Sequence, residues 1–160
     1  MANRVDKDIK PMKFSVPISS LLHHKAKAMW SISPDATVFE AIKIMAEKNI
    51  GALPVLLDGK LVGMFTERDY ARKIALQGKS SKETRVREIF TGVVITVRPD
   101  DSVEDCMKLM TEHRVRHLPV VDKENVVGIV SIGDLVNWTI SAQDAAISQM
   151  EQYIAGGVAA

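Results

Sequence analysis

Cysteine is almost absent from this chain, because Cys106 is the only one in 160 residues. No disulfide can form within the chain, so we expect it to occupy a reducing compartment, which we take to be the cytoplasm. Charge is nearly balanced, with 21 Lys and Arg against 20 Asp and Glu and a net charge of +1. Such a chain lacks the strong field that attracts proteins to nucleic acid or acidic lipid.

Long apolar segments are missing too. No uninterrupted apolar run approaches the ~20 residues that a membrane span requires, and the polar residues 1–8 lack the apolar core of a secretory signal. Hydrophobic residues still make up 46% of the chain, which is ordinary for a globular protein with a buried core. We therefore expect a soluble protein with no membrane and no nucleic-acid partner.

The sequence also lacks the motifs that mark common catalytic and phosphate-binding sites. There is no GxxxxGK[ST] loop, no GxGxxG after a strand and no GxSxG elbow. His113 and His117 have the spacing of a metal pair on a helix, but the arginines between them disfavour a cation. Cys106 falls on the apolar face of a predicted helix, where a core thiol is a better interpretation than a nucleophile. We expect no metal and no catalysis.

The chain does contain an internal sequence repeat, and its two copies are 65 residues apart. Four short motifs return in the same order: Pro34-Asp35 as Pro99-Asp100, Leu53-Pro54-Val55 as Leu118-Pro119-Val120, Val62-Gly63 as Val127-Gly128, and Thr66-x-x-Asp69 as Ser131-x-x-Asp134. A repeated unit usually stacks its copies, because one copy alone cannot bury its apolar face. A site formed by one copy would then have a counterpart in the other.

Each copy is predicted to have the order β-α-β-β-α. Apolar residues at i, i+3, i+4 and i+7 predict one amphipathic helix per copy: Val38, Ala41, Ile42 and Met45, then Val103, Cys106, Met107 and Met110. Thr37-x-x-Glu40 and Ser102-x-x-Asp105 are capping boxes at its start. Two short strands around a turn follow, at 53–57 and 61–65, and again at 118–121 and 126–130. A second helix then runs over about 67–75 and 132–140.

Apolar residues at helical spacing predict a further short helix before each copy, at 18–22 and 86–90. The chain therefore divides into four parts: an N-terminal arm at 1–15, a first repeat at 16–78, a second repeat at 79–140, and a C-terminal helix with a flexible tail at 141–160. The predicted fold class is α/β in the broad sense (α+β), built from two tandem repeats.

The residues that could carry chemistry lie where a strand passes to a helix, at Thr66-x-x-Asp69 and Ser131-x-x-Asp134. An aspartate can accept hydrogen bonds from both hydroxyls of a ribose, and a hydroxyl at a helix start can reach a phosphate oxygen. The same spacing is also a capping box that needs no ligand. Spacing alone favours the cap, whereas the repetition favours a site.

The ordered set of helix cap, amphipathic helix, Leu-Pro-Val, Val-Gly and Thr/Ser-x-x-Asp, present twice, resembles a tandem pair of cystathionine-β-synthase (CBS) domains over roughly residues 16–140. The resemblance implies two repeats packed sheet to sheet about a pseudo-two-fold axis. It also implies two clefts, which in this family often bind AMP, ADP, ATP, S-adenosylmethionine or sometimes NAD(H). We expect a stand-alone regulatory module for which AMP is the first choice of ligand. A homodimer and an effector protein are the implied partners.

Carried onto this chain, the resemblance makes Asp69 and Asp134 the ribose acceptors and Thr66 and Ser131 the phosphate contacts. Further positions that it implies along the clefts are Ser31, Ala52, Leu53, Pro54, Thr96, Leu118 and Pro119, with Trp30, Val94 and Ile95 as apolar walls. Trp30 could equally be a core aromatic.

The two copies differ in their cations. The first offers Arg68 beside its acid but Gly51 before its Leu-Pro, whereas the second offers Arg116 and His117 before its Leu-Pro. Because arginine suits bidentate contact with phosphate, we expect two competent but unequal sites. These arginines could also be plain solvated surface.

Two other functions remain open at this point. The chain could be a constitutive interaction module whose acids only cap helices, or, less favourably, a subunit of a nucleotide-acting enzyme. A nucleotide titration distinguishes the interaction module from a nucleotide sensor. A product assay would reveal the enzyme subunit.

Overall fold

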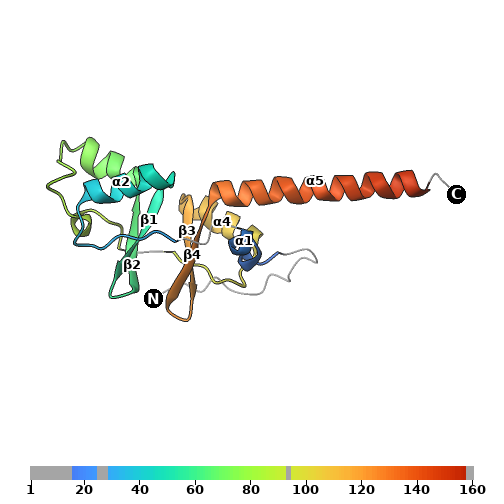
Figure 1. The fold of residues 1–160 in the computed structure, drawn as a ribbon, viewed down its shortest axis with the longest axis horizontal. Helices are drawn as coiled ribbons and strands as arrows, with labels where there is room; N and C mark the ends of the chain where they lie inside the picture. Colours follow the sequence, from blue (N-terminus) through green and yellow to red (C-terminus); the bar gives the residue numbers. More distant parts are fainter. Residues whose placement is uncertain (1–15, 25–28, 93–94, 158–160) are drawn as a thin grey trace.

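The computed structural model describes residues 16–24, 29–92 and 95–157. Two β-hairpins lie side by side at its centre, with helices around them (Figure 1). β1 (Ala52–Leu57) pairs antiparallel with β2 (Lys60–Thr66), and β3 (His117–Asp122) pairs antiparallel with β4 (Asn125–Ser131). The register of each hairpin shifts at the same place in the repeat, after Val55 and after Val120. Both predicted hairpins are confirmed.

The strand expected at the entrance of each repeat is reduced to a single bridge. Ile32 pairs in parallel with Val55, and Val97 pairs in parallel with Val120. The chain turns directly afterwards, at Pro34 and at the corresponding second-copy proline. Proline has no N–H and a fixed φ, so it cannot extend the ladder. The expected element order is present, but its first strand is one residue long.

The amphipathic helices form where the spacing predicted them, as α2 (Val38–Lys48) and α4 (Val103–His113). Thr37 caps α2 with a complete box: its side chain accepts from the Glu40 N–H at 3.1 Å, and its own N–H donates to the Glu40 carboxylate at 2.8 Å. At α4 the Ser102 hydroxyl accepts from the backbone N–H of Asp105 at 3.0 Å. These bonds satisfy N–H groups that a helix start otherwise leaves unpaired.

The second helices of the two repeats differ in length. α3 (Glu67–Tyr70) continues as one π-helical turn, η1 (Ala71–Ala75), and the chain leaves it through Gly78 at φ +63°. α5 runs over Ile132–Gly157 without a break. The helices expected before and after residue 140 are therefore one helix as far as Gly157, and residues 158–160 lie outside the described residues. No Gly or Pro stands between Gly133 and Gly156 to end it.

Each short leading helix packs on the opposite repeat. α1 (Ile18–His24) places Ile18 and Leu21 in the core that holds Leu118 and Val130, whereas η2 (Val86–Glu88) places Val86 in the core of Leu53 and Phe65. The two helices therefore bind the repeats together crosswise. Figure 1 shows α1 beside α4 rather than beside α2.

Two equivalent glycines make this crossing possible. A Cβ on Gly63 would lie 2.2 Å from Cδ2 of Phe90, and one on Gly128 would lie 2.8 Å from Cδ2 of Leu22. At Gly63, where the backbone oxygen of Thr91 is also close, only glycine allows this approach, whereas at Gly128 the neighbour is the end of a flexible side chain. The repeated Val-Gly motif thus has a packing role.

Within the described residues, no helix combines the length and the apolar character of a membrane span.

Candidate functional site

The junction between β2 and α3 is organised around Asp69, whose side chain is only 13% exposed. Its Oδ2 accepts hydrogen bonds from the N–H of Thr66 at 3.0 Å and from its hydroxyl at 3.1 Å. The backbone N–H of Asp69 donates back to Oγ1 of Thr66 at 3.2 Å. The predicted capping box is therefore complete at this position.

The other oxygen of Asp69 faces the segment that leads into the second repeat. Oδ1 accepts from the Thr91 hydroxyl at 3.3 Å and lies 3.2 Å from the ammonium of Lys73. The same ammonium donates to the carbonyl oxygen of Ile89 at 2.8 Å. Both carboxylate oxygens are thus engaged, and Asp69 joins its own hairpin to the inter-repeat segment.

The equivalent junction of the second repeat has the same cap but a different surrounding. The N–H of Ser131 donates to Oδ2 of Asp134 at 2.8 Å, and the N–H of Asp134 donates to the Ser131 hydroxyl at 3.1 Å. The residue one turn further on is Trp138, which packs against the core of that repeat, where the first repeat has Lys73. The position one turn after the acid therefore holds a cation in the first repeat and an aromatic residue in the second.

The residues just before each Leu-Pro face one another across the boundary between the repeats. A Cβ on Gly51 would lie 3.4 Å from Cε1 of His117 and 3.5 Å from Cδ of Glu67. The carbonyl of Gly51 accepts the first N–H of α3 at 3.0 Å, and that of Arg116 accepts the first N–H of α5 at 2.9 Å. Each helix start is therefore tied to the residue just before the first hairpin strand of its own repeat.

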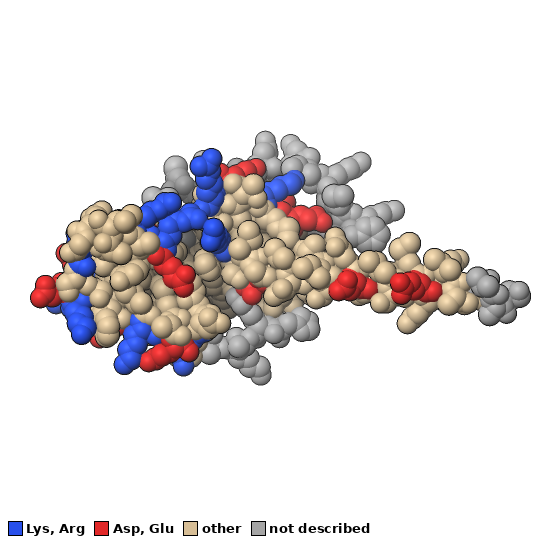
Figure 2. All heavy atoms as spheres, turned by 90° about the horizontal axis from the view of Figure 1, so that it is seen from above, with Lys and Arg blue, Asp and Glu red and all other residues tan. Residues whose placement is uncertain are grey.

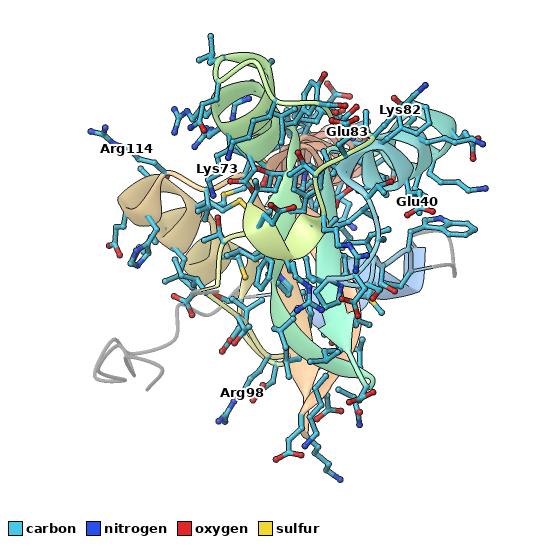
Figure 3. All side chains as sticks on the ribbon, turned by 90° about the vertical axis from the view of Figure 1, so that its left-hand side faces the viewer. Glu40, Lys73, Lys82, Glu83, Arg98 and Arg114 are labelled. Atoms are coloured by element: carbon cyan, nitrogen blue, oxygen red, sulfur yellow. The ribbon has the colours of Figure 1, made fainter. Side chains whose placement is uncertain are left out.

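A cation of the first repeat reaches the second. Nη1 of Arg68 donates to the backbone carbonyl of Arg114 at 2.8 Å, and Arg114 ends α4 in the left-handed conformation at φ 53°. A helix C-terminus carries partial negative charge, so it is a suitable partner for a guanidinium. Figure 3 shows Lys73 and Arg114 on the same side of the molecule. The Arg114 and Arg116 side chains are exposed.

The remaining predicted residues fall into two groups. Five are buried at the beginnings of β1 and β3: Ala52, Leu53, Pro54, Leu118 and Pro119. Ser31 and Thr96 are exposed, each one residue before a bridge. Thr96 lines a hollow of about 700 Å³ together with Arg98 and Lys123. Val94 lies outside the described residues.

Trp30 is not a core aromatic. Its side chain is 40% exposed, and the ammonium of Lys48 lies 4.2 Å from the centre of its ring. The core interpretation is therefore wrong for this residue. The ring is available to solvent on the same chain segment as Ser31.

The interpretation of Cys106 as a core thiol is confirmed. Its side chain is fully buried in the core of the second repeat. Burial, and then the charges of Asp101 and Asp105, raise the pKa of the thiol to about 12. A thiol that stays protonated is a poor nucleophile.

Three contacts of this site were missed in the sequence: Lys73 and Thr91 on Asp69, and the Arg114 carbonyl on Arg68. Lys73 stands four residues after Asp69, the spacing of a helical ion pair, so the sequence carried a signal for it. The other two contacts join residues distant in sequence, for which no local pattern exists.

Comparison with known proteins agrees with this arrangement. The CBS domain family matches the chain over residues 25–76 and 86–141. The CBS domain-containing protein CBSX3, mitochondrial, of Arabidopsis thaliana is 40% identical over 153 residues, covering 89% of this chain and 74% of the relative.

Two solved structures are similar as well. A candidate signal-transduction protein with CBS domains from Burkholderia ambifaria MC40-6 is 47% identical with a TM-score of 0.77, over 80% of this chain and 96% of that one. The CBS domain pair of protein MJ0100, solved in complex with 5′-methylthioadenosine and S-adenosyl-L-methionine, is 30% identical with a TM-score of 0.71, over 80% of this chain and 98% of that one.

Two hairpin-and-helix units with equivalent capped acids define a tandem-repeat module. The chain belongs to the CBS domain family, which it matches in two successive segments. The resemblance found in the sequence, and the α+β fold class, are confirmed.

Proposed function

We propose that this chain is a regulatory module that binds an adenine nucleotide at the Thr66–Asp69 and Ser131–Asp134 junctions. The observation that carries the proposal is their equivalence: each repeat holds a part-buried acid and hydroxyl where a hairpin meets a helix. The adenosine compounds bound by the MJ0100 pair support this ligand class. AMP is our first choice, and ATP, ADP and NAD(H) follow. We infer that the chain regulates rather than catalyses.

Binding at the first junction would require an exchange of hydrogen bonds. A ribose hydroxyl is a donor, and Oδ1 of Asp69 already accepts from Thr91 beside Lys73. A nucleotide that takes these positions releases Thr91, and with it the segment that enters the second repeat. A ligand shifts a conformational equilibrium only by making different contacts in the two states. This exchange supplies such a difference.

Phosphate groups would meet different cations at the two junctions. Arg68 stands two residues after Thr66 in the first repeat, and Arg116 with His117 precede the Leu-Pro of the second. A phosphate that draws Arg68 away from the Arg114 carbonyl would break a link between the repeats. We therefore propose unequal affinities for the same nucleotide at the two sites.

A second candidate is a constitutive interaction module. The observation that favours it is that both capping boxes are complete and that Asp69 has partners on both oxygens. In that case the acids only stabilise helix starts, and nucleotide adds no stability.

The remaining expectations are also part of the proposal. We propose a second copy of the chain and an effector protein as partners. The cytoplasm remains the proposed location on the strength of the single cysteine, although the Arabidopsis relative is described as mitochondrial.

The deciding experiment is a thermal-shift screen with AMP, ADP, ATP, NAD, NADH and S-adenosylmethionine. The protein must first be shown by native mass spectrometry to be free of nucleotide. A ligand that binds only the folded state at ~100 times its Kd adds about 2.7 kcal/mol, which for a chain of this size is roughly 6–10 °C. A flat screen would favour the interaction module.

A further inference from the structure

The second half of α5 extends away from the rest of the protein (Figure 1). Leu135 is fully buried and Trp138 packs on the core of the second repeat, but residues 141–156 are all exposed. Most of the stability of a helix in a protein comes from packing one apolar face. This part of α5 has no such packing within the described chain, so its apolar residues lack a cover.

Those apolar residues form one stripe with a seven-residue period. Its members are 45–64% exposed: Val136, Ile140, Ile147, Met150 and Ile154. Ile140, Ile147 and Ile154 recur every seventh residue, and so do Val136, Gln143 and Met150. These are the a and d positions of a heptad, the pattern by which helices pair as a coiled coil. A helix that merely lies in water has no reason to keep this period.

The stripe is free to accept a second helix. At 100° per residue it lies about 130°, a little more than a third of a turn, from the face that Leu135 and Trp138 present to the protein. A partner helix can therefore approach along the stripe without displacing this contact. The stripe begins beside the second repeat, at Val136, and continues to the described end of α5.

Charge favours one orientation of that partner. The only charged residues between positions 141 and 157 are Asp144 and Glu151, and both fall at heptad position e. Figure 2 shows two acidic patches on the extended arm. In an antiparallel pair of identical helices the e positions face each other, which places these acids together. In a parallel pair they face position g, here the uncharged Thr139, Ala146 and Tyr153.

We propose that the occupant of this stripe is α5 of a second copy of the chain, in a parallel, in-register two-stranded coiled coil. Every layer then pairs like with like, and isoleucine at the three a positions with none at the d positions fits two strands better than three or four. Gln143 meets its counterpart at a d position, where two amides can hydrogen-bond and fix the register. The two pairs of repeats lie at the same end of the rod. This interface is separate from the nucleotide junctions and would form in a chain that binds no ligand.

The first test is the mass of the full-length protein in solution, by light scattering and analytical ultracentrifugation over a dilution series. We expect a dimer. Ile147→Lys should raise the dimer dissociation constant by roughly 100-fold or more, because it buries two lysines in one layer. Gln152→Lys is the matched control: it adds the same charge on the opposite face of the same helix and should leave the dimer intact.

Folding of the variants is measured separately. Ile147 lies outside both cores, so near-ultraviolet circular dichroism of the tryptophans should be unchanged in both. A monomeric parent protein would overturn the proposal. So would an Ile147→Lys variant that stays as dimeric as the control.

The second test is the orientation. Gln143→Cys should form a covalent dimer on mild oxidation, because d residues of parallel helices lie within reach of a disulfide. Gln152→Cys should not, and neither should the parent, whose Cys106 is buried. A dimer that Gln143→Cys fails to link would overturn the parallel arrangement. A chain found only with a different protein along α5 would overturn the choice of a second copy.

Discussion

The guanidinium of Arg68 and the backbone carbonyl of Arg114, 2.8 Å apart, join the start of α3 in the first repeat to the end of α4 in the second. Arg68 is also the cation that the sequence predicts for phosphate at the first junction. One side chain thus stands between two partners, the other repeat and the proposed ligand. This competition gives a physical route from binding at one site to the packing of both repeats.

The first prediction concerns this arginine. Arg68→Ala should weaken the binding of ATP more than the binding of adenosine, because only ATP has phosphate groups that contact the guanidinium. The difference should be about 1 kcal/mol or less, since the group is exposed, and it should shrink with added salt. Isothermal titration with adenosine, AMP and ATP measures it. Arg72→Ala is the control, an exposed arginine on the following turn. Equal losses for adenosine and ATP would mean that Arg68 only holds the repeats together.

The second prediction concerns Arg116 in the other repeat, where the cation precedes β3. Arg116→Ala should also weaken ATP more than adenosine, but with no loss of the Arg68 contact between the repeats. The free energy of unfolding measured in urea should therefore change less for Arg116→Ala than for Arg68→Ala. If Arg116→Ala leaves ATP binding unaltered at low salt, Arg116 is solvated surface, and the second site relies on other groups.

The third prediction tests the crosswise packing of the leading helices. Gly63→Ala should destabilise the protein by about 1–3 kcal/mol, the range for overpacking, because its Cβ would meet Phe90 and the backbone oxygen of Thr91 at 2.4 Å. Gly128→Ala should be milder, since it meets only the end of the Leu22 side chain. Gly92→Ala, with open space around it, is the control. Equal urea midpoints for all three variants would contradict the packing.

Local features of this fold could be predicted from the sequence, and distant ones could not. The caps at Thr37 and Thr66 and the hairpin at Asp58-Gly59 depend on residues within four positions of each other, so their patterns are visible in one dimension. The crossing of α1 to the second repeat depends on a surface that exists only after folding. The helical spacing at residues 18–22 indicates which face of the helix is apolar. It does not indicate against which of the two cores that face packs.

The candidate site shows the same division. The repeat placed the Thr66–Asp69 and Ser131–Asp134 pairs at equivalent junctions, but the contacts of Asp69 with Thr91 come from the inter-repeat segment. The continuation of α5 through residue 140 was missed for another reason. The second helix of the first repeat is followed by a turn at Gly78, whereas the second repeat has no stop signal before Gly156. The change from packed to exposed helix at residue 141 does not alter the helix propensity of the sequence.

The fourth prediction concerns pH. Because the pKa of Cys106 rises from 9.0 to about 12 on folding, the unfolded chain loses this proton at a lower pH than the folded one. Its contribution to stability is complete below pH 9 and is lost as the pH rises towards about 12. Cys106→Ala should remove this part of the alkaline slope, measured as the free energy of unfolding against pH. An unchanged slope would mean that other groups account for all of it.

The fifth prediction separates a helix cap from a ligand site. Asp69→Asn and Asp134→Asn keep a side-chain oxygen for the cap but remove the charge. Each should weaken nucleotide binding at its own junction by about 1–3 kcal/mol, as for a hydrogen bond to a charged group. Without ligand, Asp69→Asn should also lower stability, because it removes the pairing with Lys73.

Asp105→Asn is the matched control, because Asp105 stands at the same place behind the Ser102 cap of α4 but lies outside the proposed junctions. It should leave nucleotide binding unchanged. Titration calorimetry for binding and urea unfolding for stability are measured on all three variants. Normal nucleotide binding by both junction variants, together with a loss of stability, would show that these acids only cap helices. The nucleotide would then bind elsewhere on the chain, because a ribose acceptor that loses its charge binds its ligand more weakly.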